Sequence, residues 1–353
     1  MMTAIQWLNS SAFDFFISIF VLYHPDRFGL RMSWAAGARS RIPVEQREFL
    51  DLAQQFLPVP LTWLYRLNPL PQNAAQALAA LAEIPPEEGL AAWMVDGSTP
   101  EKVREALAAA ARQHGHSEVQ RAVLRSGLLK YAAKPSAKAM QLYYEAAAEP
   151  GAFAERFRTA MQTYYQVFFS EEEERIQPLL TEALRSAQQQ AAGKTVDAVV
   201  EELSRGVQVG DLERLQRVAV AASYWTSPLV FYTYPLPDTL LLVFGCRQEG
   251  QPLIPGGLVP ETLIRTFKAL GDPTRLRILR LLSQSPHTPT QLSRVLRLRP
   301  PTVVHHLTEL RVCGLVHVLI QPGVERLYAL RPEGLDLVQR GLHDYLNDPF
   351  EET

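Results

Sequence analysis

Side chains able to bind nucleic acid are concentrated around the pair Pro300-Pro301. Arg294, Arg297 and Arg299 precede the pair, and Arg311 follows it. Guanidinium groups form paired hydrogen bonds with phosphate oxygens, and shorter donors placed between them can reach the edges of bases. Four arginines alone would indicate a solvated helical face, so the interpretation depends on the elements that position them.

A helix must begin close to this Pro-Pro pair, because proline is tolerated in the first turn of a helix and disrupts its interior. We expect this helix to run from Thr302 to Val312, with Gly314 as its stop. Asp272 followed by Pro273 predicts another helix start. Similar signals predict helices at 263–270, 273–282, 290–296 and 332–346, and a hairpin at 317–330 that turns at Pro322-Gly323. This order of elements indicates a helix-turn-helix followed by a wing.

Three blocks of this segment resemble the ArsR-type (arsenic-repressor-like) winged-helix family. They are ALGDPTRLRIL at 269–279, TVVHHL at 302–307 and CGLV at 313–316. The resemblance covers roughly a quarter of the chain. It implies a DNA-binding transcription regulator, expected to be a repressor, that binds double-stranded DNA and dimerises through its first and last helices. One departure is Val304, where the family often has a small hydroxyl residue.

The resemblance implies a set of DNA contacts from the recognition helix, the helix before it and the wing. Within the recognition helix the groove-facing residues would be Thr302, Val303, His305 and His306, with Arg299 at the entry to the groove. Adjacent helical residues point in different directions, so we expect one histidine to contact DNA and the other to pack or face solvent. The resemblance also implies a support from Gln291 and a contact of Arg326, on the wing, with the minor groove or the DNA backbone. Arg311, near the end of the recognition helix, is available as a phosphate ligand because of its charge and position.

A metal site is not expected. Several members of the family sense metals through paired cysteines on the helix before the recognition helix, and residues 290–296 contain no thiol. On the last helix, Asp336, His343 and Asp344 are too sparse for a site. Cys246 and Cys313 are isolated, which predicts two reduced thiols and no disulfide. We therefore expect no cofactor.

Apolar stripes on the two outer helices are candidates for a homodimer interface. Such a stripe is usually core, but on a terminal helix of a small domain it can be a dimer seam. The residues concerned are Leu263 and Phe267 on the first helix, and Leu335, Val338, Leu342 and Tyr345 on the last.

Charge is divided unevenly along the chain, whose net charge is −2. Residues 259–345 hold twelve Arg and Lys against seven Asp and Glu, a net +5, whereas residues 1–258 hold 23 against 27, a net −4. A basic excess on the segment with the motif is what a phosphate-binding module requires. The division supports a domain at 1–250, a Gly- and Pro-rich linker at 251–260 and a winged helix-turn-helix domain at 261–346.

The first region is predicted to be helical up to about Ser204, with Ser170 capping a helix that starts with four glutamates. Apolar runs at 217–224, 228–234 and 239–246 then predict a small antiparallel sheet. The expected fold is therefore mainly α. The run at 12–23 is too short to span a membrane and contains Asp14, so we expect a buried helix in a cytoplasmic protein without a membrane partner.

No catalytic motif is recognised in this region, and an enzyme is not expected. Its five tryptophans could line a ligand pocket, but a role in the core is the more common one. Two functions stay open for the region: binding of a small-molecule, non-metal effector, or oligomerisation. The alternative for the whole chain is a winged-helix protein-interaction module without sequence-specific DNA binding.

Overall fold

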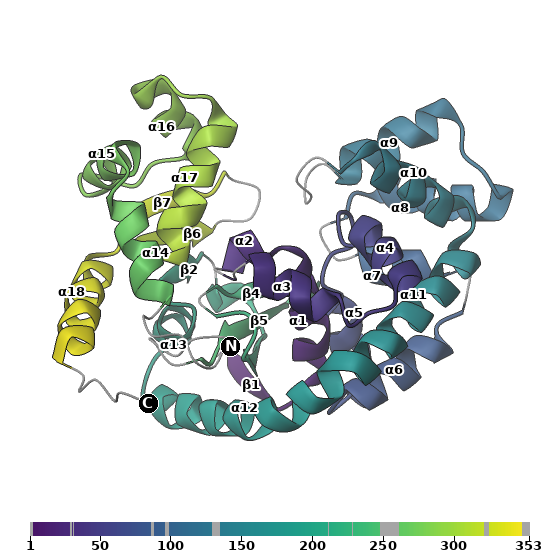
Figure 1. Ribbon diagram of the computed structural model, residues 1–353, viewed down its shortest axis with the longest axis horizontal. Helices are drawn as coiled ribbons and strands as arrows, with labels where there is room; N and C mark the ends of the chain where they lie inside the picture. Colours follow the sequence, from purple (N-terminus) through teal and green to yellow (C-terminus); the bar gives the residue numbers. More distant parts are fainter. Residues whose placement is uncertain are drawn as a thin grey trace.

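The computed structural model describes residues 3–28, 30, 32–85, 88–95, 99–128, 135–210, 212–227, 229–247, 261–320 and 325–347. These residues form a crescent (Figure 1). The C-terminal elements form one arm and a bundle of short helices forms the other, while a sheet and the long helix α12 (Ser170–Ala191) join the two. The mainly helical class expected from the sequence is confirmed.

The sheet of the first region is mixed, and the expectation of a small antiparallel sheet is wrong in this respect. Its order is β1-β3-β5-β4. Strands β1 (Ala4–Leu8), β3 (Arg217–Ser223) and β5 (Thr239–Gly245) run parallel, and β4 (Phe231–Leu236) pairs antiparallel with β5, as the expected hairpin does. Strands β3 and β5 are buried almost throughout, which explains their continuous apolar sequences, because a central parallel strand is covered on both faces.

Helix α1 (Ala12–Tyr23) is the buried helix that the sequence predicts. It follows β1 directly and packs, like α12, against β3. Among the described helices, none combines the length and hydropathy needed to cross a membrane. Helices α5 (Leu61–Arg66) and α13 (Val196–Leu203) contact β4 and β5 respectively.

The second arm of the crescent is helical, as expected for the residues before Ser204. Aromatic rings form much of its core: the ring centroids of Trp93 and Phe157 lie 4.6 Å apart. Trp63 and Trp225 are also buried, so these tryptophans are core residues. The helices of this arm and of its junction with the sheet are α2 (Pro25–Phe28), α3 (Met32–Arg39), α4 (Val44–Ala53), α6 (Ala74–Glu83), α7 (Gly89–Met94), α8 (Glu101–Gln113), α9 (Glu118–Leu128), α10 (Ala137–Ala148) and α11 (Pro150–Tyr164).

Ser170 does not cap a helix start, contrary to the prediction. Helix α11 continues through a π-helical segment, Tyr165–Phe169, into α12, so Ser170 lies within one long helical run. Glu173 instead accepts hydrogen bonds from Ser11 Oγ, at 2.5 Å, and from the backbone N–H of Ala74, at 2.8 Å. It therefore joins the starts of α1 and α6 to α12.

The C-terminal elements follow the expected winged-helix order closely. The recognition helix starts at Pro300 rather than Thr302, because both prolines fit its first turn. Residues 321–324, with the expected wing turn, and the predicted linker at 251–260 lie outside the described residues. The elements are α14 (Glu261–Leu270), α15 (Pro273–Leu282), α16 (Pro289–Leu296), α17 (Pro300–Val312), β6 (Val316–Ile320), β7 (Leu327–Leu330) and α18 (Pro332–Asn347).

A short strand of the first region extends the sheet of the wing. Strand β2 (Val207–Val209) pairs parallel with β6, which gives a three-stranded sheet in the order β2-β6-β7. At the same junction His317 Nδ1 lies 3.1 Å from the carbonyl oxygen of Gly206. A second contact is formed where Arg265 Nη2, on α14, donates to the carbonyl oxygen of Asp26, on α2, at 2.7 Å. The two regions are thus joined by backbone pairing as well as by side chains.

Candidate nucleic-acid interface

The recognition helix α17 exposes its N-terminal half and buries one face. Arg299, Thr302 and His305 are exposed, as expected of residues that would reach DNA. Val303 is fully buried, so its predicted place in the groove is wrong. It shares the core face with Leu307 and Leu310, and the spacing of four and three residues already carried this signal. The residue exposed in its place is Val304, at 44%.

Two capped helices hold α17 in position. Asp272 Oδ1 accepts hydrogen bonds from the backbone N–H groups of Thr274 and Arg275, at 2.8 and 3.0 Å, which fixes the start of α15 as predicted. Thr288 and Gln291 form a reciprocal capping box at the start of α16. Gln291 therefore stabilises the supporting helix through its side-chain oxygen, while its side chain remains exposed.

The adjacent histidines of α17 lie in different environments. His305 is exposed, whereas His306 is half-buried with an Nδ1 atom that has no hydrogen-bond partner among the described residues. Burial lowers the pKa of His306, and the nearby carboxylate of Asp272 partly offsets this effect. His306 thus faces the start of α15, and His305 is the histidine available to a ligand.

The two other predicted arginine contacts differ in accessibility, because Arg311 is half-buried and Arg326 is exposed. Burial lowers the pKa of the Arg311 guanidinium, and the side chains of Tyr328, Arg326 and Tyr232 lie close enough to influence it electrostatically. The guanidinium of Arg326 lies 6.0 Å from the ring centroid of Tyr232 on β4. Arg311, on α17, therefore packs against the wing. Its predicted phosphate contact does not fit this arrangement.

The remaining cations flank the exposed start of α17. Arg294 and Arg297 are exposed at the end of α16, where Arg297 adopts a left-handed conformation with φ of 56°. Arg299 follows as the N-terminal cap residue of α17 and makes no capping hydrogen bond through its side chain. Between them Val295 is 54% exposed. An exposed start of a helix with three guanidinium groups and small apolar side chains can bind phosphates and thymine methyl groups.

The residues predicted for a dimer interface divide into buried and exposed ones. Leu263 is 9% exposed and belongs to the core of the protomer, so it is not available to a partner in this arrangement. Phe267 and Leu335 are 43% and 41% exposed, on helices α14 and α18, which contact each other. The other three, Val338, Leu342 and Tyr345, are half-buried on α18.

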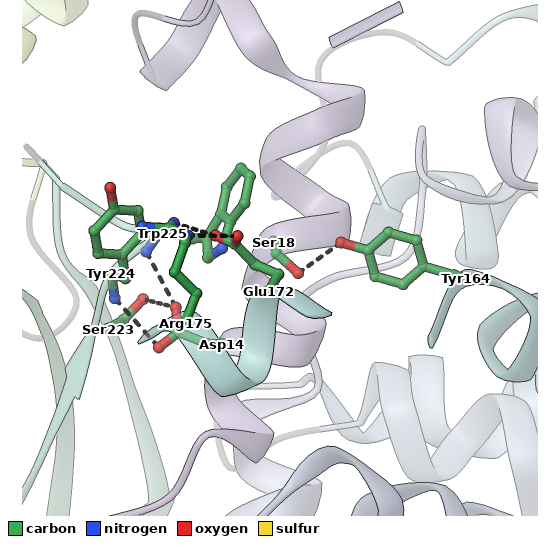
Figure 2. Close-up of polar contacts among 8 residues, drawn as sticks. All are labelled: Asp14, Ser18, Tyr164, Glu172, Arg175, Ser223, Tyr224 and Trp225. Carbon is green, nitrogen blue, oxygen red and sulfur yellow. Dashed lines mark hydrogen bonds and ion pairs between the residues drawn. The ribbon is translucent and has the colours of Figure 1, made fainter. Parts of the chain in front are cut away.

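A buried polar cluster lies where strands β1 and β3 end (Figure 2). Asp14 accepts hydrogen bonds from Ser223 Oγ at 2.6 Å and from the backbone N–H groups of Tyr224 and Trp225 at 3.2 and 3.1 Å. Burial raises the pKa of Asp14 to about 7, against the lowering effect of these hydrogen bonds. The Asp14 side chain thus holds the loop that follows β3. The sequence signal for this buried polar cluster was a carboxyl group within an otherwise apolar helix.

Other chemistry is sparse in the described part of the chain. His, Cys, Asp and Glu side chains nowhere gather there in threes that could hold a metal ion. Cys246 and Cys313 are free and half-buried, and burial raises the pKa of both thiols, that of Cys246 to about 12.

Comparison with known proteins gives a family match that lies in the C-terminal domain. Residues 272–318, from the Asp272 cap into the first strand of the wing, match the sequence profile of the family "Bacterial regulatory protein, arsR family". An ArsR-like transcriptional regulator from Rhodococcus sp. RHA1 is 30% identical over 23% of this chain and 76% of that protein, with a TM-score of 0.22. Reduced HlyU from Vibrio cholerae N16961 is 26% identical over 25% of this chain and 90% of that protein, with a TM-score of 0.20. None of the curated proteins matches the chain.

Proposed function

This protein belongs, through its C-terminal domain, to the ArsR family of bacterial regulatory proteins, and on that premise we propose that it is a transcription regulator. It binds duplex DNA with the start of α17 in the major groove and with the β6–β7 wing beside it. The observation that carries the proposal is the exposed cationic start of α17, with Arg294, Arg297 and Arg299, within a domain of this family. Repression is its expected mode of action.

Dimerisation supports this function, because two recognition helices read two half-sites one DNA turn apart. Exposed apolar side chains on α14 and α18, Phe267 and Leu335 among them, support an interface between two copies. Phe267→Glu is expected to shift the purified chain from dimer to monomer in light scattering after size exclusion. Val119→Glu, at a 75% exposed position on α9, is the control and is expected to leave the mass unchanged.

DNA binding is tested directly with duplex fragments from the region upstream of the encoding gene. Fluorescence anisotropy at several salt concentrations is expected to give an affinity that falls steeply with salt and exceeds that for a scrambled duplex. A shallow slope without sequence preference would instead support the alternative, a winged helix that binds other proteins.

The first region supports a regulatory role for the remainder of the chain. It contacts the wing through β2, and its α2 contacts α17. We assign it to residues 1–250 and the linker to 251–260, and propose that it senses a non-metal effector or enlarges the dimer. A change in the packing of this region against the wing would alter the geometry of the DNA-binding surface.

A further inference from the structure

A groove on the first region lies where the end of α5 meets the sheet. Its volume is about 420 Å³, which is within the range of small-molecule sites. Strands β1, β3 and β4 contribute residues to it, and so does the segment that follows α5. The nine residues that line it are Gln6, Leu8, Tyr65, Arg66, Leu67, Asn68, Leu70, Arg217 and Leu236.

The lining of this groove combines cationic and apolar side chains. Four of the nine residues are leucines, two are arginines, and none is a carboxylate. A groove with this composition favours a ligand that carries both a negative charge and an apolar body.

The two arginines have different roles. Arg66 is fixed, since its Nε and Nη2 atoms both donate to the carbonyl oxygen of Pro235, at 2.9 and 2.7 Å. Arg217 is exposed, and its Nη1 atom reaches Tyr65 Oη at 3.5 Å, which is a weak hydrogen bond. Tyr65 Oη in turn donates to Gln6 Oε1 at 3.1 Å. Arg217 thus keeps donors for an anion at the groove, with Tyr65 beside it.

We propose that this groove binds a small organic monoanion, with its carboxylate on the Arg217 guanidinium and its hydrocarbon part against the leucine side chains. A bidentate guanidinium–carboxylate pair supplies orientation, and burial of the apolar chain supplies affinity. The proposal identifies the effector site and the effector class of the first region, and its regulatory consequence rests on the proposed function.

Strand β4 connects this groove to the wing. Leu236 lines the groove, the Pro235 carbonyl holds Arg66, and Tyr232 of the same strand lies under Arg326 of the wing. A ligand that contacts Leu236 and Arg66 therefore touches the strand that carries a wing contact. Ligand binding changes DNA affinity to the extent that it favours one arrangement of β4 over another.

Calorimetric titration of the full chain with octanoate tests the site. The wild type is expected to bind one octanoate per chain, and Arg217→Gln is expected to weaken binding at least about tenfold, because the cation that pairs with the carboxylate is removed. Leu236→Asp, at a 39% exposed position, is expected to weaken it too. Arg125→Gln, on the exposed surface of α9, is the matched control and is expected to bind as the wild type does. Octanamide, which has the same chain without the charge, is expected to bind more weakly than octanoate.

Two results would overturn the binding site: no binding of octanoate by the wild type at millimolar concentrations, or equal binding by Arg217→Gln. The DNA titration separates this proposal from the proposed function. Octanoate is expected to change the DNA affinity of the wild type and not that of Arg217→Gln, and binding without such a change would overturn the effector role. A chain that binds octanoate through Arg217 but binds no duplex would contradict the proposed function and leave the groove assignment intact.

Discussion

The guanidinium of Arg326, on the wing, lies 6.0 Å from the ring centroid of Tyr232, on strand β4 of the first region. An arginine over an aromatic ring at this distance gains about 0.5–1 kcal/mol at an exposed site. The proposed function requires the same cation for a DNA phosphate or the minor groove. If the wing binds DNA as proposed, its arginine has two competing partners, one within the chain and one on DNA.

Removal of the Tyr232 ring is expected to favour the binding of DNA. Tyr232→Ala should raise the affinity for operator DNA roughly two- to fivefold, because Arg326 no longer gives up the cation–π contact when it binds. Tyr232→Phe keeps the ring and serves as the control, with unchanged affinity expected. Anisotropy titrations of the three proteins measure the effect. Equal affinities for the wild type and the alanine variant would show that Arg326 does not exchange partners.

Adjacent valines of α17 are expected to respond in opposite ways to the same substitution. Val303→Ser places a hydroxyl in a fully buried position and should lower the free energy of unfolding by about 1–3 kcal/mol. Val304→Ser, at a 44% exposed position, should change it by less than about 0.5 kcal/mol. Urea denaturation measures both values. A larger loss for Val304→Ser would reverse the assignment of the buried face.

The exposed start of α17 is expected to carry the DNA contacts. Arg299→Ala combined with His305→Ala should lower DNA affinity roughly 10- to 100-fold, through loss of a phosphate or base contact at each position. The helix should persist, since Arg299 makes no side-chain capping bond. Circular dichroism checks the fold, and Arg125→Ala on α9 controls for the loss of positive charge. Unchanged binding by the double variant would exclude this end of α17 from the interface.

Gly206 is expected to tolerate no side chain at the junction of the two regions. Its φ is +97°, and an added Cβ atom would collide with the ring of His317. Gly193, with φ of +77° and open space around it, is the matched control: alanine there adds backbone strain alone, about 1–2 kcal/mol. Gly206→Ala should lower the free energy of unfolding further and accelerate amide exchange in β6, which pairs with β2. Equal losses at the two glycines would mean that the junction can adjust.

Asp14 is expected to make stability depend on pH. Its pKa is raised from 3.8 to about 7 in the folded chain, so the folded state retains a proton that the unfolded state releases. The associated stability is complete below pH about 4 and is lost as the pH rises toward about 7, by at most about 1.4 kcal/mol per pH unit.

The difference in unfolding free energy between the wild type and Asp14→Asn isolates this contribution, because other titrating groups are common to both proteins. It is expected to shift in favour of the variant between pH 4 and 7 and to stay level at higher pH. A pH-independent difference would indicate that Asp14 is ionised throughout this range in the folded protein.

The sequence by itself determined the C-terminal domain, because its signals are local. Asp272-Pro273 and Pro300-Pro301 specify helix starts through their own backbone and capping chemistry, within a few residues of where the structure has them. The same local signals predicted that the arginines before α17 are exposed and that the two adjacent histidines of α17 point in different directions.

Only the tertiary structure decided which distant segments meet. The sequence did not indicate that β1 would join a parallel sheet with β3, that β2 would extend the wing, or that Tyr232 would approach Arg326 and Arg311. Each of these contacts joins residues at least 79 positions apart, and each depends on packing energies summed over the whole core rather than on the residues at the contact. The contacts of the first region with the DNA-binding domain were decided by the tertiary structure, and so was the groove proposed to bind an organic anion.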